Sequence, residues 1–300
     1  MDRRLLTVAG AVASIWLSQS TGGEAQRLSL ILALPVQGNV FMLAGPLTNS
    51  AVQTGSEGTL LVDTQVQEVS DILAESIARV SPGRIRFIIS TSSNDDHTGG
   101  NDRLSSMAAV IAHENVRIRM RQRGIPEGRW PSDVYSGTER RVDFNGEAIR
   151  IIHPPSAISD GDSFVVFEGS NVVATGDAFT PDRYPRIDLN AGGDIDGLIA
   201  ALDLLLTLST SMSTPDRPVA ILPGRGPVSD AAGVLEYRDA MALIRDRIQE
   251  MVVAGMTLAE ATAAMPTSDF DSVYGTRAYP GDAFVETVHR SLTEEAASLR

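Results

Sequence analysis

The sequence predicts an α/β protein in which two β-sheets pack face to face beneath outer helices. Two observations support this fold class. Short runs rich in Val, Leu and Ile occur in two groups along the chain, and segments with helical spacing accompany each group. Because every sheet and helix must bury an apolar face, stacked layers of sheets and helices satisfy both kinds of element.

The first group of strands is punctuated by Gly, Asn and Pro, which mark turns. Strands are predicted at residues 28–35, 39–43, 50–54, 59–62, 86–90 and 107–112. Helices are predicted at residues 68–80, where apolar residues recur at helical intervals, and at 115–123. The strand at 86–90 runs directly into a polar loop at 91–98, and residues 124–137 are expected to be irregular.

The second group of strands has the same punctuation. Strands are predicted at residues 139–144, 149–153, 163–167, 171–175 and 219–222. Helices are predicted at residues 195–210, 231–254, 258–264 and 282–299. The last three would form a helical C-terminal part, about residues 231–300, of one domain that spans residues 26–300.

The composition excludes several kinds of chemistry. The 300-residue chain has 38 acidic and 25 basic residues, a net charge of −13, and so lacks the basic surface that binds nucleic acid. Every basic residue is arginine and no residue is cysteine, which excludes lysine Schiff bases, thiol catalysis and disulfides. Of the four histidines, His113 and His153 end predicted strands and are expected to be structural.

The first 25 residues resemble a secretory signal peptide. Arg3 and Arg4 precede an apolar run from Leu5 to Leu17, and Ala25 is the expected last residue before cleavage. The run is shorter than the roughly 20 apolar residues that cross a bilayer. We therefore expect an exported protein, periplasmic or secreted, without a stable membrane span after cleavage. An uncleaved anchor and a buried first helix are the alternatives.

The loop at residues 91–101 carries the strongest motif. It reads TSSNDDHTGGN, which resembles the T-H-x-H-x-D-H-x-G-G-N signature of the metallo-β-lactamase superfamily with both leading histidines replaced. Other landmarks of that superfamily occur in its order: LLVDT at 60–64, HPPSAISDGD at 153–162, TGD at 175–177 and LPGRGPV at 222–228. The AHEN segment at 112–115 resembles a segment found in one exported branch of the superfamily. The resemblance implies a four-layer αββα sandwich of a hydrolase-like protein, with its groove where these loops meet.

Members of this superfamily commonly hold two zinc ions, which activate a water for hydrolysis. At the ligand positions of the first zinc, this chain has Ser92, Asn94 and Ile158. Hydroxyl and amide groups are poor zinc ligands and isoleucine is none, so the resemblance implies that the first metal site is lost. Asp63, which ends the LLVDT segment, is expected to shape the loop beside the groove.

The second zinc position keeps part of its ligand set. Asp96 and His97 are retained and Asp177 stands at the bridging position, but Arg225 replaces the last histidine. A guanidinium is permanently charged and opposes a cation, whereas it can bridge two carboxylates through charge-assisted hydrogen bonds. We therefore expect no metal, and a salt bridge from Arg225 to Asp96 and Asp177.

Two functions remain open from the sequence. The favoured one is a pseudoenzyme that is structural or binds a small molecule in the groove, where a ligand carboxylate would pair with Arg225. The alternative is a hydrolase with one divalent metal, Zn, Mn or Fe, held by Asp96, His97 and Asp177, with Asp96 as the candidate catalytic residue. A nucleophilic Ser92 is disfavoured because the sequence assigns it no oriented base. Substrate and oligomeric state stay open.

Overall fold

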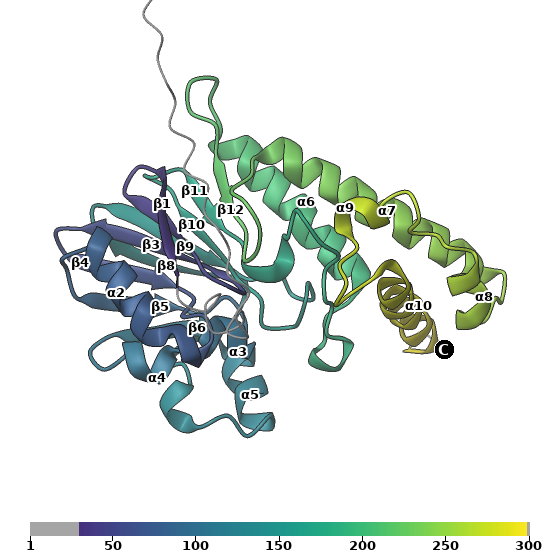
Figure 1. Cartoon of the computed structure of the whole chain (residues 1–300), viewed down its shortest axis with the longest axis horizontal. Helices are drawn as coiled ribbons and strands as arrows, with labels where there is room; N and C mark the ends of the chain where they lie inside the picture. Colours follow the sequence, from purple (N-terminus) through teal and green to yellow (C-terminus); the bar gives the residue numbers. More distant parts are fainter. Residues whose placement is uncertain (1–29, 299–300) are drawn as a thin grey trace, which may run out of the picture.

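Two β-sheets lie face to face with helices outside each of them, as Figure 1 shows for residues 30–298, the part of the chain that the computed structural model describes. The predicted four-layer αββα sandwich is therefore confirmed. The expected signal peptide, residues 1–25, lies outside the described residues.

The first sheet has seven strands in the order β1-β2-β3-β4-β5-β6-β7. Their bounds are Leu32–Gln37, Val40–Ala44, Asn49–Gly55, Gly58–Val62, Ile85–Ile89, Ala109–His113 and Asp133–Tyr135. Strands β1 to β4 pair antiparallel, whereas β4 to β7 pair in parallel. Because parallel strands end at the same edge of a sheet, the loops after β4, β5 and β6 meet at one side of the sandwich.

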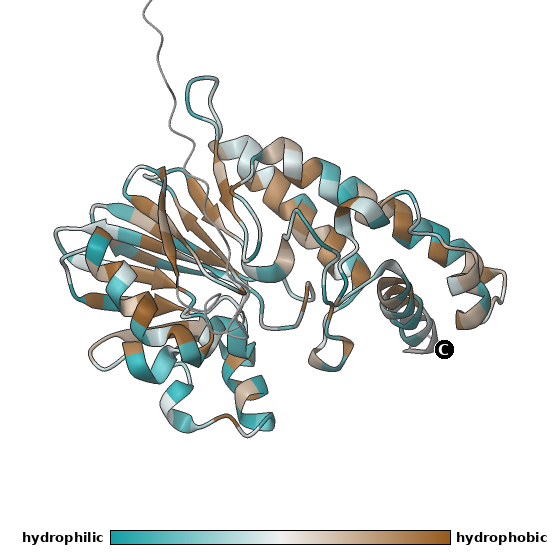
Figure 2. Ribbon diagram, in the orientation of Figure 1, coloured by the Kyte–Doolittle hydropathy of each residue, from teal (hydrophilic) through white to brown (hydrophobic). Residues whose placement is uncertain are grey.

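The second sheet has five strands in the order β12-β11-β10-β9-β8. In chain order from β8 to β12, their bounds are Glu139–Phe144, Glu147–Ile152, Phe164–Phe167, Val172–Ala174 and Ala220–Leu222. Strands β11 and β12 are parallel neighbours, so the segments that follow them leave the sheet side by side. Apolar side chains such as Leu60, Ile89, Ile151 and Val165 form the core between the sheets, and both sheets carry many hydrophobic residues, which are brown in Figure 2.

The helices α2 to α10 cover the outer faces of the sheets and extend beyond them. Their bounds are Ser70–Val80, Asp95–Thr98, Asn101–Leu104, Glu114–Gln122, Ile195–Met212, Ala231–Val253, Leu258–Ala263, Asp271–Tyr274 and Gly281–Ser298. Helix α2 buries Leu73 and Ile77 against the first sheet, while α6 and α7 pack on the second. Helix α6 is long and apolar enough to cross a membrane, but Leu198, Leu202 and Leu205 are buried in this core, which explains its composition.

One predicted loop contains regular structure, which corrects the prediction of an irregular segment at residues 124–137. It includes a 3₁₀ turn at Glu127–Arg129 and strand β7, which pairs with β6. The equally short β11 and β12 are apolar runs, whereas β7 reads DVY, which has neither an apolar run nor the length to show alternation. Its Tyr135 is buried, with Oη 2.9 Å from Ser163 Oγ, so a tertiary contact holds the strand in place.

Candidate functional site

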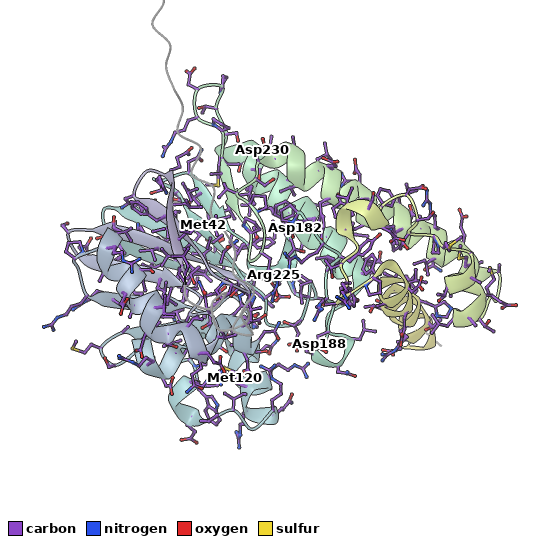
Figure 3. The ribbon with its side chains drawn as sticks, viewed as in Figure 1. Met42, Met120, Asp182, Asp188, Arg225 and Asp230 are labelled. Atoms are coloured by element: carbon purple, nitrogen blue, oxygen red, sulfur yellow. The ribbon has the colours of Figure 1, made fainter. Side chains whose placement is uncertain are left out.

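The segments that follow three strands bring the expected site residues together. The loop after β5 carries Asp96 and His97, the turn after β11 carries Asp177, and the loop after β12 carries Arg225. Figure 3 shows Arg225 near the middle of the molecule, with Asp182 beside it on the segment that follows β11. The order of the strands in the sheets therefore produces the cluster that the motifs predict.

Arg225 bridges the two expected carboxylates. Its Nε lies 3.1 Å from Asp177 Oδ1, and its Nη2 contacts Asp96 Oδ2 and lies 3.2 Å from Asp177 Oδ2. Its Nη1 donates to the carbonyl oxygen of Leu47 at 2.8 Å. The side chains of Arg225 and Asp177 are only 18% and 13% exposed. All three guanidinium nitrogens are thus engaged in a contact that is largely shielded from water.

His97 is fully buried beside this ion pair. Its Nδ1 lies 2.6 Å from Asp63 Oδ2, and its Nε2 lies 3.2 Å from Asp177 Oδ2 without alignment for a hydrogen bond. Burial lowers the pKa of His97, but the charges of Asp177 and Asp63 outweigh it and raise the pKa well above its usual value. Although burial raises the pKa of Asp177, His97 and Arg225 hold it well below its usual range.

Asp63 anchors the loop after β5, as the resemblance implies. It accepts hydrogen bonds from the backbone N–H of Thr91 at 2.7 Å and from the Thr91 hydroxyl at 2.6 Å. Its backbone has a φ of 61°, a conformation that few residues other than glycine adopt. The carboxylate therefore joins the end of β4 to both the loop and the His97 ring.

Replacing Asp63 with alanine is expected to lower the free energy of unfolding by about 2–3 kcal/mol, because it leaves the buried Thr91 N–H and His97 without their acceptor. Chemical denaturation at neutral pH measures the change. Asp71→Ala is the matched control, since the Asp71 side chain is 77% exposed and pairs with Arg103 at the surface. Equal losses in the two variants would contradict the anchoring role.

A close approach of two backbones positions Arg225. The N–H of Gly224 donates to the carbonyl of Gly176 at 2.7 Å, and a Cβ on Gly224 would lie 2.6 Å from the Gly176 backbone. A side chain at Gly224 would force the two loops apart. Asn49 donates to the carbonyl of Pro223 at 3.0 Å and so holds the same loop. No sequence motif predicts Asn49, because its partners are backbone carbonyls.

Ser92, Asn94 and Ile158 do not form a ligand set. Ser92 Oγ accepts a hydrogen bond from the Asn94 N–H at 3.2 Å, and Ile158 is 2% exposed in the core beneath α6. Both ring nitrogens of His97 face carboxylates, so His97 is not placed as a base for Ser92. The geometry does not support a serine nucleophile.

The residues present fit one metal ion better than two. In the described part of the chain, Asp96, His97 and Asp177 offer ligand atoms within 4.8 Å of one another. Asp63 on Nδ1 of His97 matches the carboxylate that commonly orients a metal-binding histidine. Two zinc ions do not fit, because the first set of positions offers only a hydroxyl and an amide, which are poor zinc ligands. A single ion would compete with Arg225, which already contacts both carboxylates.

A pocket of about 600 Å³ adjoins the cluster, within the range of roughly 300–1,000 Å³ that is typical of small-molecule sites. Asn94 and Arg225 contribute to its lining. Further lining residues are Tyr184, from the segment after β11, and Tyr279, from the segment before α10. No motif predicts these tyrosines, because only tertiary packing brings their segments to the groove.

His113 and His153 form a stacked pair, with ring centroids 3.7 Å apart. His153 Nδ1 donates to the carbonyl of Asp162 at 2.8 Å, and His113 Nδ1 accepts from the N–H of Asn115 at 3.3 Å. Both rings are therefore hydrogen-bonded to backbone, as structural histidines are expected to be.

Protonation of this pair is expected to destabilise the fold. Burial lowers the pKa of each histidine below 6.5, and the neighbouring His153 lowers that of His113 further. The native state then binds fewer protons than the unfolded state, so stability is full above pH 6.5 and falls as the pH drops below it. Burial also raises the pKa of Asp162 to about 7. As the pH falls below about 7, the folded protein therefore binds a proton that the unfolded chain does not, and this increases the free energy of unfolding. The effect of Asp162 is opposite to that of the histidines.

A His153→Gln variant separates these opposing effects. We expect acidification from about pH 7.5 to about pH 5.5 to cost the variant less unfolding free energy than it costs the wild type. Chemical denaturation at both pH values measures the difference, and Asp162 contributes equally to the two proteins. Identical pH dependence in both proteins would contradict the assignment.

Two stacked sheets under outer helices thus bring acidic groups and a histidine together where strand-end loops meet. A family model described as the metallo-beta-lactamase superfamily matches residues 44–239, which is more than half of the chain. The chain belongs to that superfamily. No curated protein matches it.

Several solved structures share the fold. A metallo-beta-lactamase from Pontibacter korlensis is 14% identical with a TM-score of 0.60, over 71% of this chain and 99% of that one. The DIM-1 metallo-beta-lactamase is 16% identical with a TM-score of 0.59, over 71% and 97%. The inverting sec-alkylsulfatase Pisa1 from Pseudomonas sp. is 15% identical with a TM-score of 0.70, over 87% of this chain and 50% of that one. At these identities the similarity shows the fold alone.

Proposed function

We propose that this protein is a pseudoenzyme of the superfamily that binds a small molecule in the pocket beside Arg225, without a catalytic metal. The observation that carries the proposal is the bridge from Arg225 to Asp96 and Asp177. The guanidinium supplies the positive charge that these carboxylates need, and it holds them in place by hydrogen bonds. The adjoining pocket retains the volume of a ligand site.

The metal content of protein purified without chelator tests this proposal. We expect far less than one zinc, manganese or iron ion per chain by elemental mass spectrometry, and no thermal stabilisation by added Zn²⁺ or Mn²⁺. Close to one tightly bound ion per chain would contradict the proposal. A thermal-shift screen of neutral, cationic and anionic organic compounds, without metal, then tests for ligand binding.

One observation favours a second candidate function, hydrolysis with a single divalent metal. Among the described residues, Nε2 of His97 forms no aligned hydrogen bond, and it lies 3.2 Å from Asp177 Oδ2 in the cluster with Asp96. These three residues would hold the ion if Arg225 turned away, and the ion would supply Lewis acidity and an activated water.

Substrate turnover distinguishes the second candidate from the first. Suitable substrates are a β-lactam, a lactone, a thioester, a phosphoester and, because one structural neighbour is a sec-alkylsulfatase, a secondary alkyl sulfate. Turnover that requires Zn²⁺ or Mn²⁺ and is lost in Asp96→Ala would favour the hydrolase. Asp95→Ala is the matched control, because the Asp95 side chain is 61% exposed and pairs with Arg129 instead.

We also propose that the protein acts outside the cytoplasm, because residues 1–25 have the pattern of a signal peptide. Intact mass spectrometry of protein recovered from the periplasm or the medium tests this. A mass that lacks the residues up to Ala25 would support export, and retention of the whole chain in the cytoplasm would contradict it.

A further inference from the structure

Three arginines line the pocket, and two of them already have carboxylate partners. Arg225 donates to Asp96 and Asp177 and to a backbone carbonyl. Arg183 donates to both oxygens of Asp182, at 2.7 Å and 3.0 Å. The charge of each guanidinium is therefore compensated by the protein itself.

Arg186 is the third arginine of the lining and is placed differently. Within residues 30–298 it forms no ion pair with a carboxylate. Its guanidinium donates to the carbonyl of Ala278 at 3.3 Å and lies 5.2 Å from the centroid of the Tyr279 ring. The Tyr279 hydroxyl lies 2.8 Å from Thr287 Oγ1, which fixes the ring. A guanidinium held over an aromatic ring with donors to spare is suited to bind a carboxylate.

The same pocket offers apolar surface beside this charge. Leu47, which lines the pocket, is 51% exposed and presents an aliphatic side chain to it. Tyr279, which is partly exposed, adds aromatic surface to the lining. The net charge of −13 disfavours ligands that carry several negative charges, whereas one uncompensated arginine matches a single one.

We propose that the ligand of this pocket is an organic monoanion, whose carboxylate binds Arg186 and whose apolar body lies against Leu47 and Tyr279. The inference rests on the proposed ligand-binding function and adds the charge of the ligand and the residue that recognises it. It differs from the expectation that a ligand carboxylate would pair with Arg225, because the nitrogens of Arg225 are all engaged.

A pair of isosteric probes tests the inference by isothermal titration calorimetry on the full protein at low salt. We expect 4-phenylbutyrate to bind about tenfold more tightly than the neutral 4-phenylbutanamide, as a charge-assisted hydrogen bond at a partly exposed site would give. Arg186→Gln is expected to remove this preference, and Arg186→Lys to restore part of it. Arg277→Gln is the matched control, because Arg277 is exposed on the segment before α10 that carries Tyr279 but does not line the pocket.

Each outcome of this experiment bears on the inference. Equal binding of the acid and the amide, or equal losses in Arg186→Gln and Arg277→Gln, would overturn it while leaving a ligand pocket in place. Binding of neither probe at millimolar concentration would also overturn it. The proposed metal-free function fails separately, by the metal content of the wild-type protein.

Discussion

Replacement of Arg225 with histidine is expected to convert this cluster into a site that binds a divalent metal. The substitution removes a permanent positive charge and places an imidazole beside Asp96, His97 and Asp177, which already offer ligand atoms within 4.8 Å of one another. Loss of a residue that only hydrogen-bonds to a metal ligand lowers metal affinity by about 10–100-fold. A residue that binds the ion directly contributes more, so the new histidine is expected to raise Zn²⁺ affinity by about 100-fold or more.

Competition with a zinc-binding dye measures this gain, and elemental analysis gives its stoichiometry. Arg186→His is the matched control, since Arg186 lines the same pocket but pairs with neither carboxylate of the cluster. Zinc affinity that rises equally in both variants would indicate surface binding by the new imidazole. Zinc affinity in Arg225→His no higher than in the wild type would contradict the assignment of Arg225 to the place of a metal.

Much of the fold could be predicted because most strands and long helices show apolar runs or helical spacing in their own sequences. The strand predicted at residues 59–62 is found at Gly58–Val62, and the helix predicted at 231–254 is found at Ala231–Val253. Strand β7 and helix α3 have three and four residues, too few to show a period, and their sequences DVY and DDHT lack the apolar run that marks the equally short β11 and β12. Their structure depends on pairing with β6 and on the loop that Asp63 anchors.

The cluster could also be predicted, because each of its members lies in a motif with a fixed place in the fold. Asp177 follows β11 and Arg225 follows β12, and the two strands are parallel neighbours. The outer wall of the pocket could not be predicted. Arg186 and Tyr279 lie in segments without a motif, and their contact arises only when the segment before α10 folds back on the one after β11.

Replacement of Arg225 with methionine is expected to lower the free energy of unfolding at neutral pH by about 3–5 kcal/mol. The methionine keeps an unbranched apolar stem but removes the cation from two carboxylates that are mostly shielded from water. Chemical denaturation measures the loss. Arg103→Met is the control, because Arg103 and its partner Asp71 are 63% and 77% exposed, and such a pair contributes about 0–1 kcal/mol.

The pH dependence of this loss separates charge repulsion from lost packing. In the wild type the pKa of Asp177 is held low, so the stabilisation it provides is present above its ordinary pKa of 3.8 and is lost only as the pH falls below that value. Without the guanidinium, the repulsion between Asp96 and Asp177 is less compensated, and one of them takes up a proton more readily. Arg225→Met is therefore expected to regain stability relative to the wild type between about pH 7 and about pH 4.5, and Asp96→Asn in the same chain to restore part of it at neutral pH. A deficit that neither acid nor Asp96→Asn reduces would mean that Arg225 stabilises the fold through its contact with Leu47 and not through the two carboxylates.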